Sequence, residues 1–207
     1  MEKASGRSTE PRQKYTPPHP EPSDMMSPTL SLGQKAPDFT LPGVDGKVYS
    51  LSSFSDRPVL VVVFSCNHCP YVKAYEDRMV SIQRDYESKG VRLVAINSND
   101  SKSYPEDGFD QMVVRAKEKG FNFPYLRDES QDVVTAYGGI CTPHAMAFDS
   151  SRVLRYRGRI DDSRDPSKVT SNDLRNALDD MLSGKEVRVP DTRPFGCSIK
   201  WYATKPA

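Results

Sequence analysis

Apolar runs and polar breaks alternate along residues 31–186 in a pattern that predicts strands followed by helices. Residues 59–64 are six consecutive apolar residues, mostly β-branched, and predict a strand covered on both faces. Residues 91–96 predict a second strand of this kind. Between them, apolar side chains recur at steps of three and four from Val72 to Tyr86, which indicates a helix that ends by Gly90. The alternation favours an α/β class with a central mixed β-sheet flanked by helices.

Shorter patterns predict the remaining elements. Residues 39–41 and 47–49 flank Asp45-Gly46, a pair that favours the tight turn of a β-hairpin. Further on we expect a helix from 109 to Gly120, a strand at 123–126, a helix at 131–137 and paired strands at 145–148 and 153–160. The last helix is expected to open at Thr170, with Asp173 completing its cap, and to end at Gly184.

The two ends of the chain differ from this middle part. Residues 1–30 contain six prolines and few large apolar side chains, so they predict a disordered N-terminal tail, and translation could start at Met25 or Met26. Residues 31–186 form the predicted domain. Residues 187–207 are expected to be a C-terminal extension that docks on it.

Composition narrows the function. Lysine and arginine number 29 against 28 acidic residues, so a net charge of +1 gives no electrostatic footprint for nucleic acid or an anionic membrane. No apolar run approaches the roughly 20 residues that span a bilayer, and the N-terminus lacks the order of a secretory signal. We therefore expect a cytoplasmic protein with no nucleic-acid or membrane partner. Four cysteines are too few for a disulfide scaffold, so they are catalytic, metal-binding or buried.

Cys69 lies where the first buried strand meets the long helix. If Pro70 takes the first helical position, Cys69 is the N-cap residue, and its sulfur faces the unpaired N–H groups and positive end of the helix. Such positions lower cysteine pKa and favour the attacking thiolate, which makes Cys69 the candidate nucleophile. His68 could add a positive charge or take up a proton.

Cys66 completes a C-x-x-C pair with Cys69, a pattern typical of thiol redox sites. One alternative is that both are small buried residues that end the strand. Another is a zinc or iron–sulfur site that also uses Cys141, Cys197 or a histidine, although the second closely spaced ligand pair of such sites is absent from the sequence. We accordingly expect no cofactor.

The segment from Phe64 to Val72 resembles the active-site segment of the thioredoxin superfamily, and residues 32–201 are similar to its redoxin branch, the alkyl hydroperoxide reductase/thiol-specific antioxidant-like proteins. The branch's entry segment is matched by Ala36-Pro-Asp-Phe-Thr-Leu-Pro42, and its cis-proline by Pro143. A bacterial subgroup shares Cys-Asn-His-Cys-Pro-Tyr-Val and a terminal Gly-Cys-Ser-Ile-Lys-Trp. The resemblance implies a thioredoxin-like fold with an N-terminal β-hairpin extension.

The resemblance also implies roles for site residues. Matching Phe64 to the family's strand phenylalanine puts Cys69 at the attacking position, whereas the usual partner position is Val72, so Cys66 becomes the proposed resolving thiol. At the positions where peroxiredoxins have a threonine and a proline before the attacking cysteine, this sequence has Cys66 and Val62. Because it departs from the peroxiredoxin pattern, peroxidase activity is ranked below disulfide exchange. Pro143 would border the substrate groove and present backbone groups to an extended chain.

The other two cysteines have several interpretations. The resemblance places the loop of Cys141 beside the attacking cysteine, so Cys141 is a second candidate resolving thiol, a metal ligand or a buried residue. His144 is expected to be a hydrogen-bonded structural histidine. Cys197 lies in a tail that either docks by burying Ile199 and Trp201 or supplies a distant resolving thiol.

Two charged patterns receive structural interpretations. Alternating arginines at 155, 157 and 159 are attributed to a charged edge strand rather than to an anion site. The carboxylates of Asp161, Asp162 and Asp165 are attributed to a solvated loop.

The sequence thus predicts an antioxidant-type thiol oxidoreductase that exchanges disulfides through Cys69. Its expected partners are a protein or small-molecule disulfide, or a hydroperoxide, together with an external thiol reductant. Peroxiredoxin-like hydroperoxide reduction is the first alternative. A non-catalytic metal-binding or redox-sensing thiol protein is the second.

Overall fold

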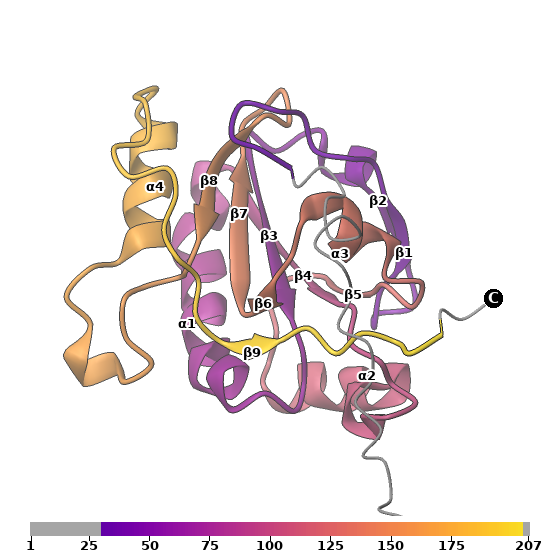
Figure 1. Ribbon diagram of the computed structural model, residues 1–207. Helices are drawn as coiled ribbons and strands as arrows, with labels where there is room; N and C mark the ends of the chain where they lie inside the picture. The colour runs from indigo at the N-terminus through magenta and orange to yellow at the C-terminus, as the bar shows by residue number, and fades with distance from the viewer. Residues whose placement is uncertain (1–29, 205–207) are drawn as a thin grey trace, which may run out of the picture.

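A computed structural model describes residues 30–204 and shows a five-stranded central sheet in the order β5-β4-β3-β7-β8 (Figure 1). Its strands are β3 (Val59–Ser65), β4 (Val91–Asn97), β5 (Tyr125–Arg127), β7 (His144–Phe148) and β8 (Leu154–Gly158). The pairs β3–β4 and β4–β5 are parallel, whereas β3–β7 and β7–β8 are antiparallel. The mixed sheet predicted from the sequence is confirmed.

Helices cover both faces of the sheet, which explains why β3 is apolar from Val59 to Phe64 and buried along its whole length. The first face packs against α1 (Pro70–Tyr86), α2 (Phe109–Glu118) and α4 (Asp173–Leu182). The second packs against α3 (Asp132–Tyr137) and the hairpin of β1 (Thr40–Pro42) and β2 (Val48–Ser50). Short 3-10 turns complete the chain: η2 (Leu51–Phe54), η3 (Glu87–Lys89), η4 (Pro105–Asp107) and η5 (Pro166–Lys168).

The predicted helical stripe and hairpin are both present. In α1 the side chains spaced three and four apart, from Val72 to Tyr86, are buried against the sheet. The hairpin pairs Thr40 with Ser50, so its strands lie one residue later than predicted. The predicted N-terminal tail lies outside the described residues except for Leu30, which is buried.

Two expectations about polar residues near α4 are wrong. The helix begins at Asp173 rather than Thr170, because the Thr170 hydroxyl and N–H both donate to the Asp162 carboxylate and hold the chain in a loop. Asp161 is not solvated. It is buried, accepts a hydrogen bond from the Tyr75 hydroxyl at 2.8 Å and pairs with Arg78 at 2.6 Å.

Strand β8 is an edge of the sheet, as its arginines predicted, and each guanidinium has a carboxylate partner. Arg155 pairs with Asp149, Arg157 with Asp191 and Arg159 with Asp173, at 2.6–2.7 Å. The edge is partly covered, because the Arg157 N–H donates to the carbonyl of Pro190. Charge and the C-terminal extension together protect this edge.

The C-terminal extension continues to the opposite end of the sheet. There β9 (Cys197–Ser198) pairs antiparallel with β6 (Cys141–Thr142), and the segment runs across the end of the sheet near the start of α1 (Figure 1). Ile199 is buried as expected, whereas Trp201 is 50% exposed, so its predicted burial is wrong. The main anchors after Ile199 are backbone and hydroxyl hydrogen bonds of Lys200 and Tyr202.

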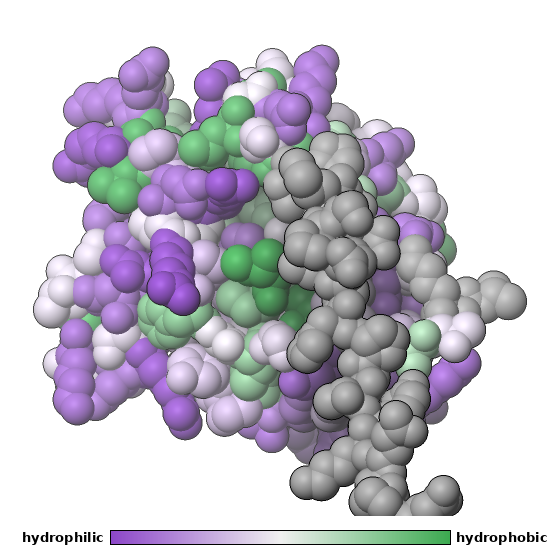
Figure 2. Space-filling view, viewed as in Figure 1, coloured by the Kyte–Doolittle hydropathy of each residue, from purple (hydrophilic) through white to green (hydrophobic). Residues whose placement is uncertain are grey.

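The visible surface in Figure 2 is largely polar, with an apolar area near its centre. Within residues 30–204, every helix is too short or too polar to cross a bilayer.

Candidate active site

Cys69 is the N-cap residue of α1 and Pro70 is its first residue, as predicted. The preceding strand, β3, delivers the chain to this point at the carboxyl edge of its parallel pair with β4. The Cys69 side chain is 0% exposed. The sulfur thus lies in a water-poor environment, where the N–H groups that open the helix act with little screening.

Hydrogen bonds hold the pKa of Cys69 well below its ordinary value. Donation from the Cys66 thiol is the largest effect, and burial of the sulfur acts in the opposite direction. Together with hydrogen bonds from the side chain and N–H of Cys197 and from the N–H of Val72, it lowers the pKa of Cys69 to about 4. One neighbour opposes ionisation, since the Thr142 carbonyl oxygen lies 3.4 Å from the sulfur and accepts a hydrogen bond from the thiol form. Several donors outweigh this single acceptor, and the thiolate is favoured.

Cys66 is the protonated member of the pair. Its side chain is buried, and its sulfur lies 3.3 Å from the Thr142 hydroxyl. Burial, donation to Cys69 and the charge of Asp107 all raise the pKa of Cys66. The two thiols therefore differ in ionisation: one is set up as an attacking thiolate and the other as a proton donor.

The remaining cysteines converge on the same place, although they lie far away in sequence. Cys141 is buried in β6, and burial followed by the charge of Cys69 raises its pKa to about 11. Cys197, in β9, is half-buried and hydrogen-bonds to Cys69, and burial raises its pKa to about 11. Pro143 follows β6 and is joined to Thr142 by a cis peptide bond, at the position that the resemblance assigned to a cis-proline. All four cysteines are free thiols.

Asp107 organises the loop that carries Cys66 and was missed by the sequence analysis. Its carboxylate is fully buried and accepts hydrogen bonds from the Asn67 N–H at 2.6 Å and from the Asn99 and Asn97 amides at 2.8 and 3.3 Å. Asn67 is also fixed by the hydroxyl of Tyr125 at 2.9 Å. The buried carboxylate thereby fixes the backbone just before Cys69.

His68 faces Asp107. Its Nδ1 lies 2.5 Å from the carboxylate, and its ring stacks on Tyr104 with centroids 4.9 Å apart. These contacts involve Asp107 and Tyr104, so the expectation that His68 adds a positive charge beside Cys69 or takes up a proton stays a prediction. The pairing instead orients the ring toward the loop of Asp107.

Three possible metal ligands meet here, because ligand atoms of Cys66, His68 and Asp107 lie within 4.8 Å of one another. Both carboxylate oxygens of Asp107 already accept hydrogen bonds from this loop and its neighbours. The Cys66 sulfur holds its proton, since its pKa is raised. A metal ion would have to displace these bonds, so the donor set fits a structural network better than a resident ion.

His144 departs from its expected role as a hydrogen-bonded residue. The ring is buried and its Nδ1 has no hydrogen-bond partner among residues 30–204. Burial, with the nearby charge of Arg157, lowers the pKa of His144 to about 4, so the ring is neutral.

A thiolate at the start of a helix, a partner thiol three residues earlier and a cis-proline beside them define a thiol-based redox site on a thioredoxin-like fold. The redoxin family profile matches residues 31–178. The chain belongs to the redoxin family. Solved structures titled as a putative thiol:disulfide interchange protein from Chlorobium tepidum and a putative thioredoxin from Neisseria meningitidis are 22% and 19% identical, cover 75% and 74% of this chain and 98% and 93% of their own, and have TM-scores of 0.58, which confirms the thioredoxin-like fold.

Relatives of the chain are named either as peroxiredoxins or as thiol-disulfide oxidoreductases. A putative peroxiredoxin of Mycobacterium tuberculosis is 30% identical over 53% of this chain and 64% of its own length. The thiol-disulfide oxidoreductase ResA of Geobacillus thermodenitrificans is 26% identical over 59% of this chain and 66% of its own length. The crystal structure of an uncharacterized conserved protein from Geobacillus kaustophilus is 43% identical, has a TM-score of 0.81 and covers 86% of this chain and 95% of that chain. The chain thus spans slightly less than two thirds of the length of the two curated relatives named here.

Proposed function

We propose that the protein is a thiol oxidoreductase in which the Cys69 thiolate attacks a disulfide. The observation that carries the proposal is the ionised Cys69 sulfur at the start of α1, next to the protonated thiol of Cys66. The thiolate is the nucleophile of disulfide exchange, and a pKa below the ambient pH keeps it fully available. The name of one relative, the thiol-disulfide oxidoreductase ResA, supports this chemistry.

The reaction uses two thiols and releases two. Cys69 forms a bond to one substrate sulfur, the substrate S–S bond breaks, and the other sulfur leaves as a thiolate. Cys66 then gives its proton to the departed substrate thiolate and attacks the Cys69 sulfur, so that the second substrate sulfur leaves as a thiolate and a Cys66–Cys69 disulfide remains. An external thiol reductant restores both thiols. Cys197 is the alternative resolving thiol, since it also hydrogen-bonds to Cys69.

Hydroperoxide reduction is the second candidate, favoured by the peroxiredoxin name of a relative that is 30% identical. Here Cys69 takes the terminal oxygen of the hydroperoxide, an alcohol leaves, and the resolving thiol displaces water from the sulfenic acid. We also assign the chain to the subgroup with Cys-Asn-His-Cys-Pro-Tyr-Val. In this chain the Asn and His of that motif, Asn67 and His68, both contact Asp107. The free thiols are compatible with a reducing compartment such as the cytoplasm.

Turnover and disulfide mapping test the proposal. The full chain is supplied with a small disulfide or hydrogen peroxide and an excess of dithiol, and its linked cysteines are mapped by mass spectrometry after one oxidising equivalent. We expect turnover that depends on Cys69 and a Cys66–Cys69 link. A Cys69–Cys197 link would show that Cys197, not Cys66, is the resolving thiol. Failure to consume either oxidant would refute the proposed function.

A further inference from the structure

The backbone edge nearest to the Cys69 sulfur is already occupied. The sulfur lies 3.4 Å from the carbonyl oxygen of Thr142, in β6. A polypeptide that brought a disulfide to this sulfur would add a strand along β6, because extended peptides bind through main-chain hydrogen bonds to an exposed edge. In this protein β9 pairs there instead, with Cys197 opposite Thr142.

The approach of β9 is close. A Cβ atom built on Gly196 would overlap the Thr142 carbonyl, so only glycine lets the extension lie this near to β6. This position lies directly before Cys197, whose N–H and thiol both hydrogen-bond to the Cys69 sulfur. The extension thus both lines the site and covers the sulfur, which is 0% exposed.

Anchors on both faces of the sheet hold β9 in place. Before it, Phe195 packs edge-on against Tyr71 and Tyr75 of α1, with ring centroids 6.2 and 6.3 Å apart. After it, Ile199 is buried in the apolar cluster on the opposite face. The segment therefore bridges the two layers across the end of the sheet, as Figure 1 shows.

Hydrogen bonds extend the second anchor. The Lys200 carbonyl accepts from the Asp100 N–H at 2.8 Å and from the Gln131 side chain at 2.8 Å. The Tyr202 hydroxyl accepts from Arg127 at 3.0 Å and donates to Glu129 at 2.6 Å. These partners lie in three places, the loop after β4, the end of β5 and the turn before α3, so releasing the segment requires several contacts to break together.

We propose that β9 is a built-in occupant of the polypeptide edge, so that extended polypeptide disulfides are excluded while residues 195–202 stay docked, whereas small oxidants, such as low-molecular-weight disulfides or hydroperoxides, need only a local opening beside the buried sulfur. This inference rests on the proposed function and specifies its substrate class. It replaces the expectation that Pro143 borders a groove open to an extended chain, since β9 fills that position.

The test compares the rates at which the full chain reduces insulin, a polypeptide disulfide, and hydroxyethyl disulfide, a small one, with dithiothreitol as reductant. Gly196→Ala displaces β9 by overlap with Thr142, and Ile199→Asp removes the apolar anchor. Trp201→Ala is the matched control, because this side chain lies in the same segment and is half exposed.

In the wild type we expect the insulin rate to be far below the small-disulfide rate. The insulin rate divided by the small-disulfide rate should rise about tenfold or more in Gly196→Ala and Ile199→Asp, because a larger fraction of the molecules has β9 undocked. The same ratio should stay unchanged in Trp201→Ala. Equal ratios in wild type, Gly196→Ala and Ile199→Asp would overturn the inference while leaving the enzyme intact. Absence of turnover with both substrates in the wild type would instead overturn the proposed function. Circular dichroism confirms that each variant is folded.

Discussion

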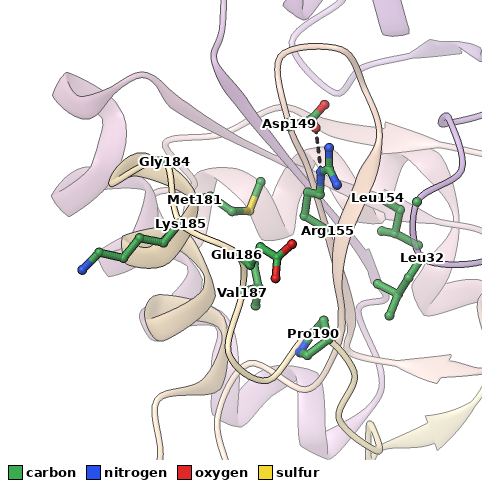
Figure 3. A pocket seen from close by; sticks show the side chains of 11 residues that line it. Leu32, Asp149, Leu154, Arg155, Met181, Gly184, Lys185, Glu186, Val187 and Pro190 are labelled. Carbon is green, nitrogen blue, oxygen red and sulfur yellow. Dashed lines mark hydrogen bonds and ion pairs between the residues drawn. The ribbon is translucent and has the colours of Figure 1, made fainter.

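The cysteine site and the hollow between α4 and β8 are opposite in character. The hollow has a volume of about 550 Å³ and is lined by apolar side chains such as Leu154, Met181 and Val187 together with the Arg155–Asp149 pair (Figure 3). The cysteine site is closed by β9, and its central sulfur is 0% exposed, yet four thiols converge on it. The volume of a hollow does not locate the chemistry in this protein.

Solvent explains the difference. Arg155 is 51% exposed on its side chain, so water and salt screen its charge and the pair contributes little. The donors around Cys69 act in a buried place, where a hydrogen bond to an ionised group is stronger. A redox centre therefore forms where the main chain starts a helix inside the protein.

Of the substitutions that distinguish the cysteine site from the hollow between α4 and β8, Cys69→Ser should have the largest effect on turnover. A serine hydroxyl stays protonated at neutral pH, so turnover with a small disulfide should fall by about a thousandfold or more. Steady-state assays with a dithiol reductant measure this loss, and thermal unfolding checks the fold. Residual turnover within tenfold of wild type would assign the attack to another thiol.

Cys66→Ala should shift the pH dependence of Cys69. Loss of the hydrogen bond from Cys66 raises the pKa of Cys69, so alkylation of Cys69 should weaken at mildly acidic pH and recover as the pH rises. Rates of iodoacetamide labelling across pH, read by mass spectrometry, measure the shift. Cys141→Ala is the control, because the Cys141 thiol donates to the carbonyl of Pro143. An unchanged profile in Cys66→Ala would assign the low pKa to the helix and Cys197 instead.

Asp107→Asn should destabilise the loop without removing a thiol. The amide nitrogen of the new side chain would face buried N–H groups that now donate hydrogen bonds to the carboxylate. Leaving one of these N–H groups without an acceptor costs about 1–3 kcal/mol. The same change should lower the pKa of Cys66, because the charge of Asp107 raises it. Chemical denaturation measures the first effect. Glu106→Gln, an exposed neighbour, is the control and should change stability little.

The smallest effect is expected in the hollow between α4 and β8. Arg155→Ala removes an exposed ion pair, so the free energy of unfolding should change by less than about 1 kcal/mol and the turnover should not change. A tenfold loss of turnover would show that this hollow takes part in the reaction.

Much of the fold is predictable from the sequence because burial leaves a periodic trace. The strand at 59–64 is apolar throughout, and the predicted stripe from Val72 to Tyr86 is buried together with only two polar side chains, Glu76 and Gln83. The start of α4 was not predicted, because Thr170 is a plausible cap whose hydroxyl instead bonds to Asp162. A local capping rule cannot register such a competing tertiary partner.

The site was only partly predictable. Cys66, Cys69 and Pro143 carry a local motif, and Cys69 occupies the N-cap that Pro70 indicated. Asp107 carries no such signal, since a carboxylate in a Pro-Glu-Asp-Gly turn is ordinarily exposed. The pairing of β9 with β6 joins Thr142 to Cys197 and Cys141 to Ser198, which are 55 and 57 positions apart, and no periodicity connects them. Trp201 was misplaced for the same reason: its exposure depends on which face the docked segment presents.

The central claim is that the buried sulfur of Cys69 is ionised near neutral pH. It is tested most directly by the ultraviolet absorbance of the thiolate, titrated against pH in the wild type with Cys69→Ser as the blank, since absorbance does not require a reagent to enter the site. We expect the difference between the two proteins to titrate with a midpoint near pH 4. A midpoint at the ordinary cysteine pKa of about 8.5, or above it, would contradict the account.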